Sequence, residues 1–96
     1  MARKHLLMDP AWPQAVQALS LEERRLLVDL LLMAALMDTP VLPLTVDSIT
    51  GMARDENERA DMIGRFAELC RAQLVRELSA GVFEIAPGLW RLENAD

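Results

Sequence analysis

The pattern of apolar and polar positions along the chain predicts four helices and three short strands. The most strongly marked helix begins at Ser20. Together with Glu23 this serine matches a capping box, in which each side chain bonds the backbone N–H of the other residue. From Leu26 to about Met37 the helix is apolar on nearly all sides. Such a composition is typical of a central helix that is buried all round.

Three further helices follow from the same kind of spacing. A short one is expected over residues 10–19, where Asp9 and Pro10 form a helix start. Another covers about residues 46–53 and is capped by Thr45. A long helix covers about residues 58–78, with Asp55 or Asn57 as its cap. Gly81 lies just beyond this long helix, where a left-handed residue commonly ends a helix.

The remaining apolar segments predict short strands. Residues 41–44 are extended and contain a proline, so they fit an edge strand. Residues 82–85 and 89–92 alternate like strands and flank a Pro-Gly pair that fits a type II turn. We therefore expect a mostly α fold with a small C-terminal β-hairpin. The prediction is a single domain over residues 1–96, with a flexible N-terminus at residues 1–8.

Composition and charge narrow the function classes. The chain has 96 residues, of which 10 are Lys or Arg and 15 are Asp or Glu, so its net charge is −5. No segment is basic, and binding to nucleic acid depends largely on basic groups that neutralise phosphates. The longest apolar run, residues 30–37, is much shorter than the roughly 20 residues of a membrane span. We expect a soluble, cytoplasmic protein that has no contact with a membrane.

The predicted order of elements is that of a winged-helix domain, with a helix-turn-helix pair and a two-stranded wing. Several motifs are similar to those of the winged-helix domain of phage and prophage replication-associated proteins. These motifs are Ser20-Leu-Glu-Glu-Arg, Leu26-Leu-Val-Asp-Leu-Leu, Leu42-Pro-Leu and Gly88-Leu-Trp-Arg-Leu. The resemblance implies a winged-helix-like fold and a role in replication, in which the helix over residues 58–78 would be the recognition helix.

Charged residues on this predicted helix and wing are the candidates for binding a partner. Four carboxylates gather at the helix start, where they either offset the helix dipole or dock a basic partner. Arg65 and Arg76 would project in nearly the same direction, either as part of a solvated, salt-bridged helix or as phosphate contacts. On such a helix the ion pairs expected from spacing are Asp61–Arg65, Arg65–Glu68 and Glu68–Arg71. The full candidate set is Asp55, Glu56, Glu58, Asp61, Arg65, Arg76 and, on the second wing strand, Arg91.

Catalytic and metal-binding chemistry finds little support in the sequence. Cys70 lies in the apolar stripe of the long helix, and His5 is the only histidine. One Cys and one His are too few for the usual structural zinc site. The chain also contains no glycine-rich phosphate loop. We therefore predict that the protein is not an enzyme and has no cofactor, metal or small-molecule substrate.

Two hypotheses of function remain. The first is a phage-type protein-interaction module whose partner belongs to replication, transcription or host defence. An inhibitor of host machinery, such as an anti-CRISPR protein, is one variant of this hypothesis. The second is a sequence-specific DNA-binding transcriptional regulator that reads the major groove with residues 58–78. A protein partner fits the acidic charge better than DNA does. A homodimer is compatible with both hypotheses.

Overall fold

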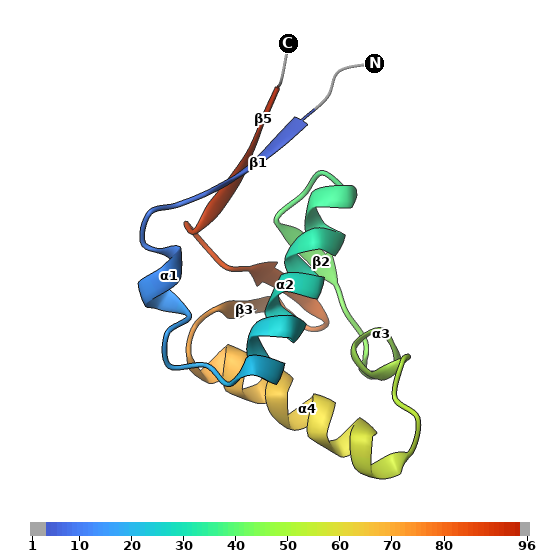
Figure 1. Ribbon diagram of the computed structural model, residues 1–96. Coiled ribbons are helices and arrows are strands. Elements are labelled where there is room, and N and C mark those ends of the chain that lie inside the picture. Colours follow the sequence, from blue (N-terminus) through green and yellow to red (C-terminus); the bar gives the residue numbers. More distant parts are fainter. Residues whose placement is uncertain (1–3, 95–96) are drawn as a thin grey trace.

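The computed structural model describes residues 4–94, which form four helices and five strands (Figure 1). In chain order these are β1 (Lys4–Met8), α1 (Trp12–Ala15), α2 (Leu21–Leu36), β2 (Val41–Pro43), α3 (Val46–Thr50), α4 (Glu56–Arg71), β3 (Val75–Ser79), β4 (Val82–Ile85) and β5 (Trp90–Asn94).

The predicted start of α2 is confirmed in detail. The Ser20 hydroxyl accepts a hydrogen bond from the Glu23 N–H at 3.1 Å. In return, the Glu23 carboxylate accepts one from the Ser20 N–H at 2.8 Å. The start of α1 differs from the prediction, because this helix begins at Trp12. The Asp9 side chain instead accepts from the Ala11 N–H at 2.9 Å, which closes a turn before the helix.

A three-stranded antiparallel sheet lies at the centre, with the strand order β2-β4-β3. The predicted strand over residues 41–44 is present as β2, and its Leu42 pairs with Phe83 of β4. Helix α2 lies across this sheet, while α4 packs against α2 and α3 (Figure 1). The most completely buried large side chains come from α2, β2, α4, β3 and β4: Leu27, Leu42, Leu69, Val75 and Ile85.

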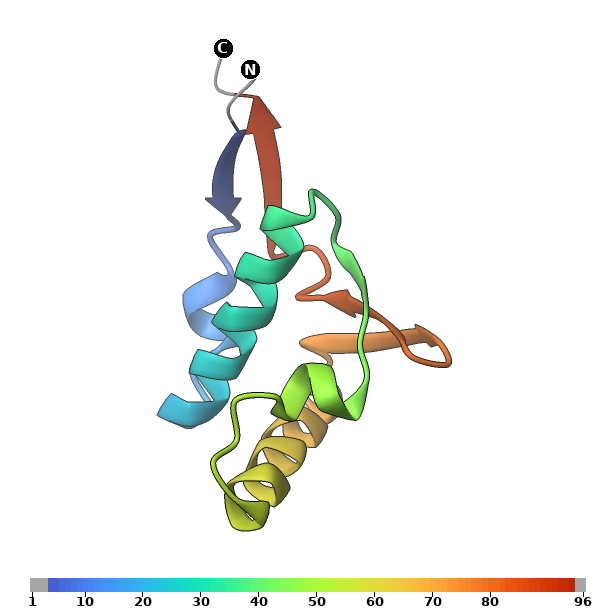
Figure 2. The same ribbon diagram turned by 90° about the vertical axis from the view of Figure 1, so that its right-hand side faces the viewer.

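A second sheet consists of β1 and β5 alone and stands away from the body (Figure 2). The two strands run antiparallel, so that Leu6 pairs with Leu92. An ion pair between Lys4 and Asp38 links this ribbon to the end of α2. Residues 4–8, which we expected to be flexible, therefore form a paired strand. Residues 1–3 of the expected flexible segment lie outside the described residues.

The predicted long helix ends seven residues early, at Arg71. Gln73 takes a left-handed conformation with φ 61°. The Leu74 N–H donates to the Leu69 carbonyl at 3.0 Å, and the Gln73 N–H donates to the Cys70 carbonyl at 3.1 Å. These two bonds form a Schellman motif, which ends a helix by satisfying its last carbonyls. The chain after it forms β3, and Gly81 lies in the β3–β4 turn with φ 75° instead of ending a helix.

The predicted fold class is wrong. Helices make up 45% and strands 24% of the structure, and the strands form two antiparallel sheets instead of one C-terminal hairpin. The Pro-Gly turn is present, since the Leu89 N–H donates to the Ala86 carbonyl at 3.1 Å. However, β4 and β5 on either side of it pair with different strands. The chain is a small α+β domain, and the winged-helix-like, mostly α prediction is corrected accordingly.

Candidate functional site

Helix α4 and its N-cap hold five of the seven residues that we predicted to bind a partner. Asp55 is the N-cap, and its carboxylate accepts from the Glu58 N–H at 2.8 Å. Glu56 and Glu58 lie in the first turn, and Asp61 and Arg65 follow one and two turns later. Carboxylates at this end interact favourably with the helix dipole. The cap and the dipole therefore account for much of the acidic cluster.

The other two predicted residues lie on different elements. Arg76 is in β3 and pairs with Glu84, directly opposite in β4, at 2.6 Å. The prediction that Arg65 and Arg76 share one helix face is wrong, because α4 ends at Arg71. Arg91 lies in β5 and forms an ion pair with Glu93 at 2.8 Å. The seven residues thus form one cluster and two separate positions.

Ion pairs along α4 differ in part from those that we expected. The predicted pair between Glu68 and Arg71 is present. Glu58 pairs with Arg54 at 3.0 Å. Among the described residues, Arg65 forms no ion pair within 4.0 Å, so its expected bonds to Asp61 and Glu68 are not made. Arg65 remains available for other contacts.

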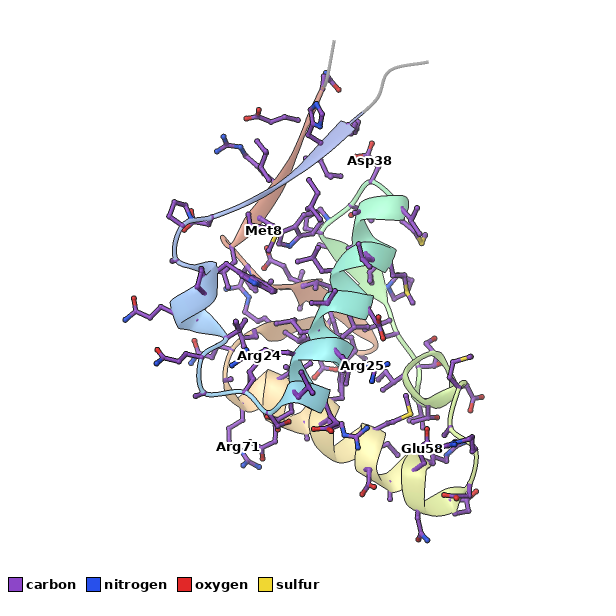
Figure 3. The ribbon with its side chains drawn as sticks, in the orientation of Figure 1. Met8, Arg24, Arg25, Asp38, Glu58 and Arg71 are labelled. Atoms are coloured by element: carbon purple, nitrogen blue, oxygen red, sulfur yellow. The ribbon has the colours of Figure 1, made fainter. Side chains whose placement is uncertain are left out.

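A hollow of about 200 Å³ lies between α2 and α4, and its lining includes Arg25 and Glu58, which are labelled in Figure 3. Leu26 and Met62 contribute the apolar part of its lining. The charged lining consists of Glu22, Arg25 and Asp29 from α2 and of Glu58 and Arg65 from α4. The hollow therefore connects the predicted cluster on α4 to the charged edge of α2.

The solvent-facing side of α2 is a feature that our sequence reasoning missed. The helix is buried on one side only, through Leu26, Leu27, Leu30, Leu31 and Ala34. On the other side Leu21 is 70% exposed, Val28 40%, Leu32 48% and Leu36 88%. Our prediction that this helix is buried all round is therefore wrong. We call these four side chains the α2 face.

A signal for the α2 face was present in the sequence. Leu21, Arg25, Val28, Leu32 and Ala35 follow one another at intervals of four, three, four and three residues. This is the spacing of a heptad seam that contacts another helix. The leucines on the opposite side of α2 hide the seam, because a helix that is apolar on both sides gives no amphipathic contrast.

The side chains of Cys70 and Trp90 take part in the structure of the domain. Burial, followed by the nearby Glu77 carboxylate, raises the pKa of the Cys70 thiol. A raised pKa disfavours the thiolate, which is the nucleophilic form of cysteine. The Trp90 indole N–H donates to the Ile85 carbonyl at 2.7 Å and so ties β5 to β4. Within residues 4–94, no cluster of three or more His, Cys, Asp or Glu side chains is arranged to hold a metal ion.

Comparisons with protein-family models, with curated proteins and with solved structures found no match. No helix in the described part of the chain combines the length and apolar character that crossing a membrane requires.

Proposed function

We propose that this protein is a non-enzymatic, cytoplasmic interaction module that binds another protein chain through the α2 face. The observation that carries the proposal is the exposure of four large apolar side chains in line along one helix. An aligned apolar surface with a charged edge is typical of a helix that packs on a partner. In both ribbon views no other helix or strand passes in front of α2 (Figures 1 and 2).

The free energy gained by burying the α2 face can be compared with the free-energy cost of association. Full burial of a Val or Leu side chain contributes about 1.5–3 kcal/mol. Scaled by its exposed fractions, the α2 face would contribute about 4–7 kcal/mol. Association itself costs about 4–15 kcal/mol. Apolar contact alone therefore only offsets the cost of association, and complementary contacts to the charged edge are needed for stable binding.

The motifs that resemble phage replication-associated proteins favour a role in replication, transcription or host defence. An inhibitor that covers part of a host machine would be one form of this role. The charged edge of α2 includes Arg25 and Asp29, and Glu58 of α4 lies beside it. The partner is therefore expected to place charges of both signs around its own apolar surface.

Binding to DNA receives less support from the same surface. Arg59 pairs with Asp47, Arg71 with Glu68, Arg76 with Glu84 and Arg91 with Glu93. Guanidinium groups that already have carboxylate partners neutralise phosphates less readily, and the whole chain carries a net charge of −5. We propose that no part of the chain reads duplex DNA.

Site-specific photocrosslinking tests the proposed role of the α2 face. A photoreactive amino acid replaces Leu36, or Met52 as a control, since these side chains are 88% and 86% exposed but only Leu36 lies on α2. We expect a protein adduct from position 36 alone. Excess unlabelled wild-type protein should prevent formation of this adduct by competition, whereas an equal excess of the Leu32→Glu variant should not. Equal adducts from both positions, or equal competition by the variant, would refute the proposal.

A second measurement addresses DNA directly. Fluorescence anisotropy with a random-sequence duplex, at about 50 and 200 mM salt, reports phosphate contacts through their salt dependence. We expect no detectable affinity at the lower salt concentration. Affinity that falls steeply between the two concentrations would instead support the DNA-binding alternative.

A further inference from the structure

We infer that the partner on the α2 face is a second copy of this chain, packed antiparallel to form a homodimer. The inference rests on the proposed role of this face and names its occupant. It is carried by the order of side chains along α2 and by the charges beside them.

The two ends of the α2 face lie symmetrically about one point, which falls between Val28 and Asp29. Leu21 and Leu36 are equally far from this point on either side, and so are Arg25 and Leu32. A two-fold axis through the point would therefore place Leu21 opposite Leu36, Arg25 opposite Leu32 and Val28 opposite Asp29. Such self-complementarity is the requirement for an isologous dimer contact.

The antiparallel register gives the apolar ends and the charges of the face suitable neighbours. Leu21 of one copy meets Leu36 of the second copy at both ends of the contact. Leu32 meets the aliphatic stem of Arg25, a packing that long basic side chains commonly make. The Arg25 guanidinium lies near Asp29 of the second copy, because that aspartate is opposite Val28, less than one helical turn from Arg25.

Charge decides between the two directions of packing. In a parallel dimer the same seam would place Arg25 against Arg25, and like charges in contact are unfavourable. In the antiparallel dimer the two arginines separate, and each approaches an aspartate. Within the described residues, neither Arg25 nor Asp29 forms an ion pair within 4.0 Å in the single chain. Both charges are thus free to pair between copies.

Sedimentation equilibrium of the purified full chain, at several concentrations up to about 100 µM, provides the test. We expect the wild-type mass to approach twice the chain mass of 10.8 kDa. Leu36→Glu should weaken dimerisation about 30-fold or more, as expected for an anchor in an interface. Met52→Glu, at an equally exposed position on the neighbouring loop, should leave it unchanged. Circular dichroism serves as the control that both variants are folded.

A mixing experiment tests the register. In the proposed contact, residue 25 of one copy lies near residue 29 of the second copy. Arg25→Asp makes both of these residues acidic, and Asp29→Arg makes both basic, so each variant alone should dimerise more weakly than wild type. An equimolar mixture should recover dimers, because opposite charges then meet between copies. Failure of the mixture to recover would overturn the antiparallel contact.

Two results would overturn the dimer itself: a wild-type chain that stays monomeric throughout, or equal dimerisation by the Leu36→Glu and Met52→Glu variants. A monomeric chain that still forms a competed adduct with a different protein at position 36 would refute the dimer but leave the proposed function standing. Absence of both dimer and adduct would refute both.

Discussion

Gln73 ends α4 in a left-handed conformation, and we expect its replacement by glycine to stabilise the protein. Its φ of 61° lies in the region that glycine adopts most readily. A residue with a Cβ atom pays about 1–2 kcal/mol there. Glycine loses about 0.4–1 kcal/mol of this advantage through the greater freedom of its unfolded chain. The Gln73 side chain is exposed, so its removal costs little packing.

The expected net gain for Gln73→Gly is about 0.5–1 kcal/mol in the free energy of unfolding. For a domain of this size it corresponds to a rise in Tm of about 3–6 °C. Urea unfolding followed by circular dichroism measures it as a higher midpoint at an unchanged slope.

Ala67→Gly is the matched control, because Ala67 is an exposed residue inside α4. A glycine at such a position costs about 1 kcal/mol. The two substitutions should therefore move the midpoint in opposite directions. If Gln73→Gly lowered the midpoint as Ala67→Gly does, the helix would continue through Gln73 and the Schellman end of α4 would be refuted.

Three further predictions concern the cap, the core and the thiol. Ser20→Ala should lower the free energy of unfolding by about 1 kcal/mol in the same titration, and an unchanged midpoint would contradict the capping box. Leu27→Ala should lower the free energy of unfolding by about 2–5 kcal/mol because Leu27 is fully buried. Leu36→Ala should lower it by less than about 0.5 kcal/mol at a concentration where the chain is monomeric, because Leu36 is exposed. Similar losses for the two variants would contradict the assignment of Leu27 to the core and Leu36 to the α2 face. The raised pKa of Cys70 means that its thiolate forms at higher pH than an ordinary thiol, so Glu77→Gln should move the pH profile of its reaction with a thiol reagent to lower pH. An unmoved profile would exclude an effect of the Glu77 carboxylate.

The sequence predicted the positions of those candidate site residues that local interactions fix. Asp55 was an expected cap, and Glu56 and Glu58 follow it in the first turn of α4. Arg76 was misplaced for a physical reason. Leu74 and Leu78 are spaced as on one helix face, but Leu74 is the last residue of the Schellman motif and Leu78 lies in β3. Apolar spacing alone does not distinguish a continued helix from a turn followed by a strand.

The α2 face was missed because burial depends on what packs around a helix. Leu27 and Leu32 are both leucines in the middle of α2, yet one is 0% and the other 48% exposed. Their difference arises from the sheet and α4, which cover only one side of the helix. The same apolar composition would suit a helix buried on all sides, so composition cannot reveal which side remains open.

The sequence by itself determined where α2, α3 and α4 begin. Ser20, Thr45 and Asp55 each bond a backbone N–H three residues ahead, and this chemistry needs no other part of the chain. Tertiary structure decided the pairing of β1 with β5, the end of α4 and the exposure of one side of α2. The pairing of β1 with β5 joins the two ends of the described chain, where Leu6 pairs with Leu92, and the segment after α4 is held as a strand where Val75 pairs with Ile85 of β4. Such contacts form only when the whole domain folds, because their free energy must offset the entropy of closing the loops between them.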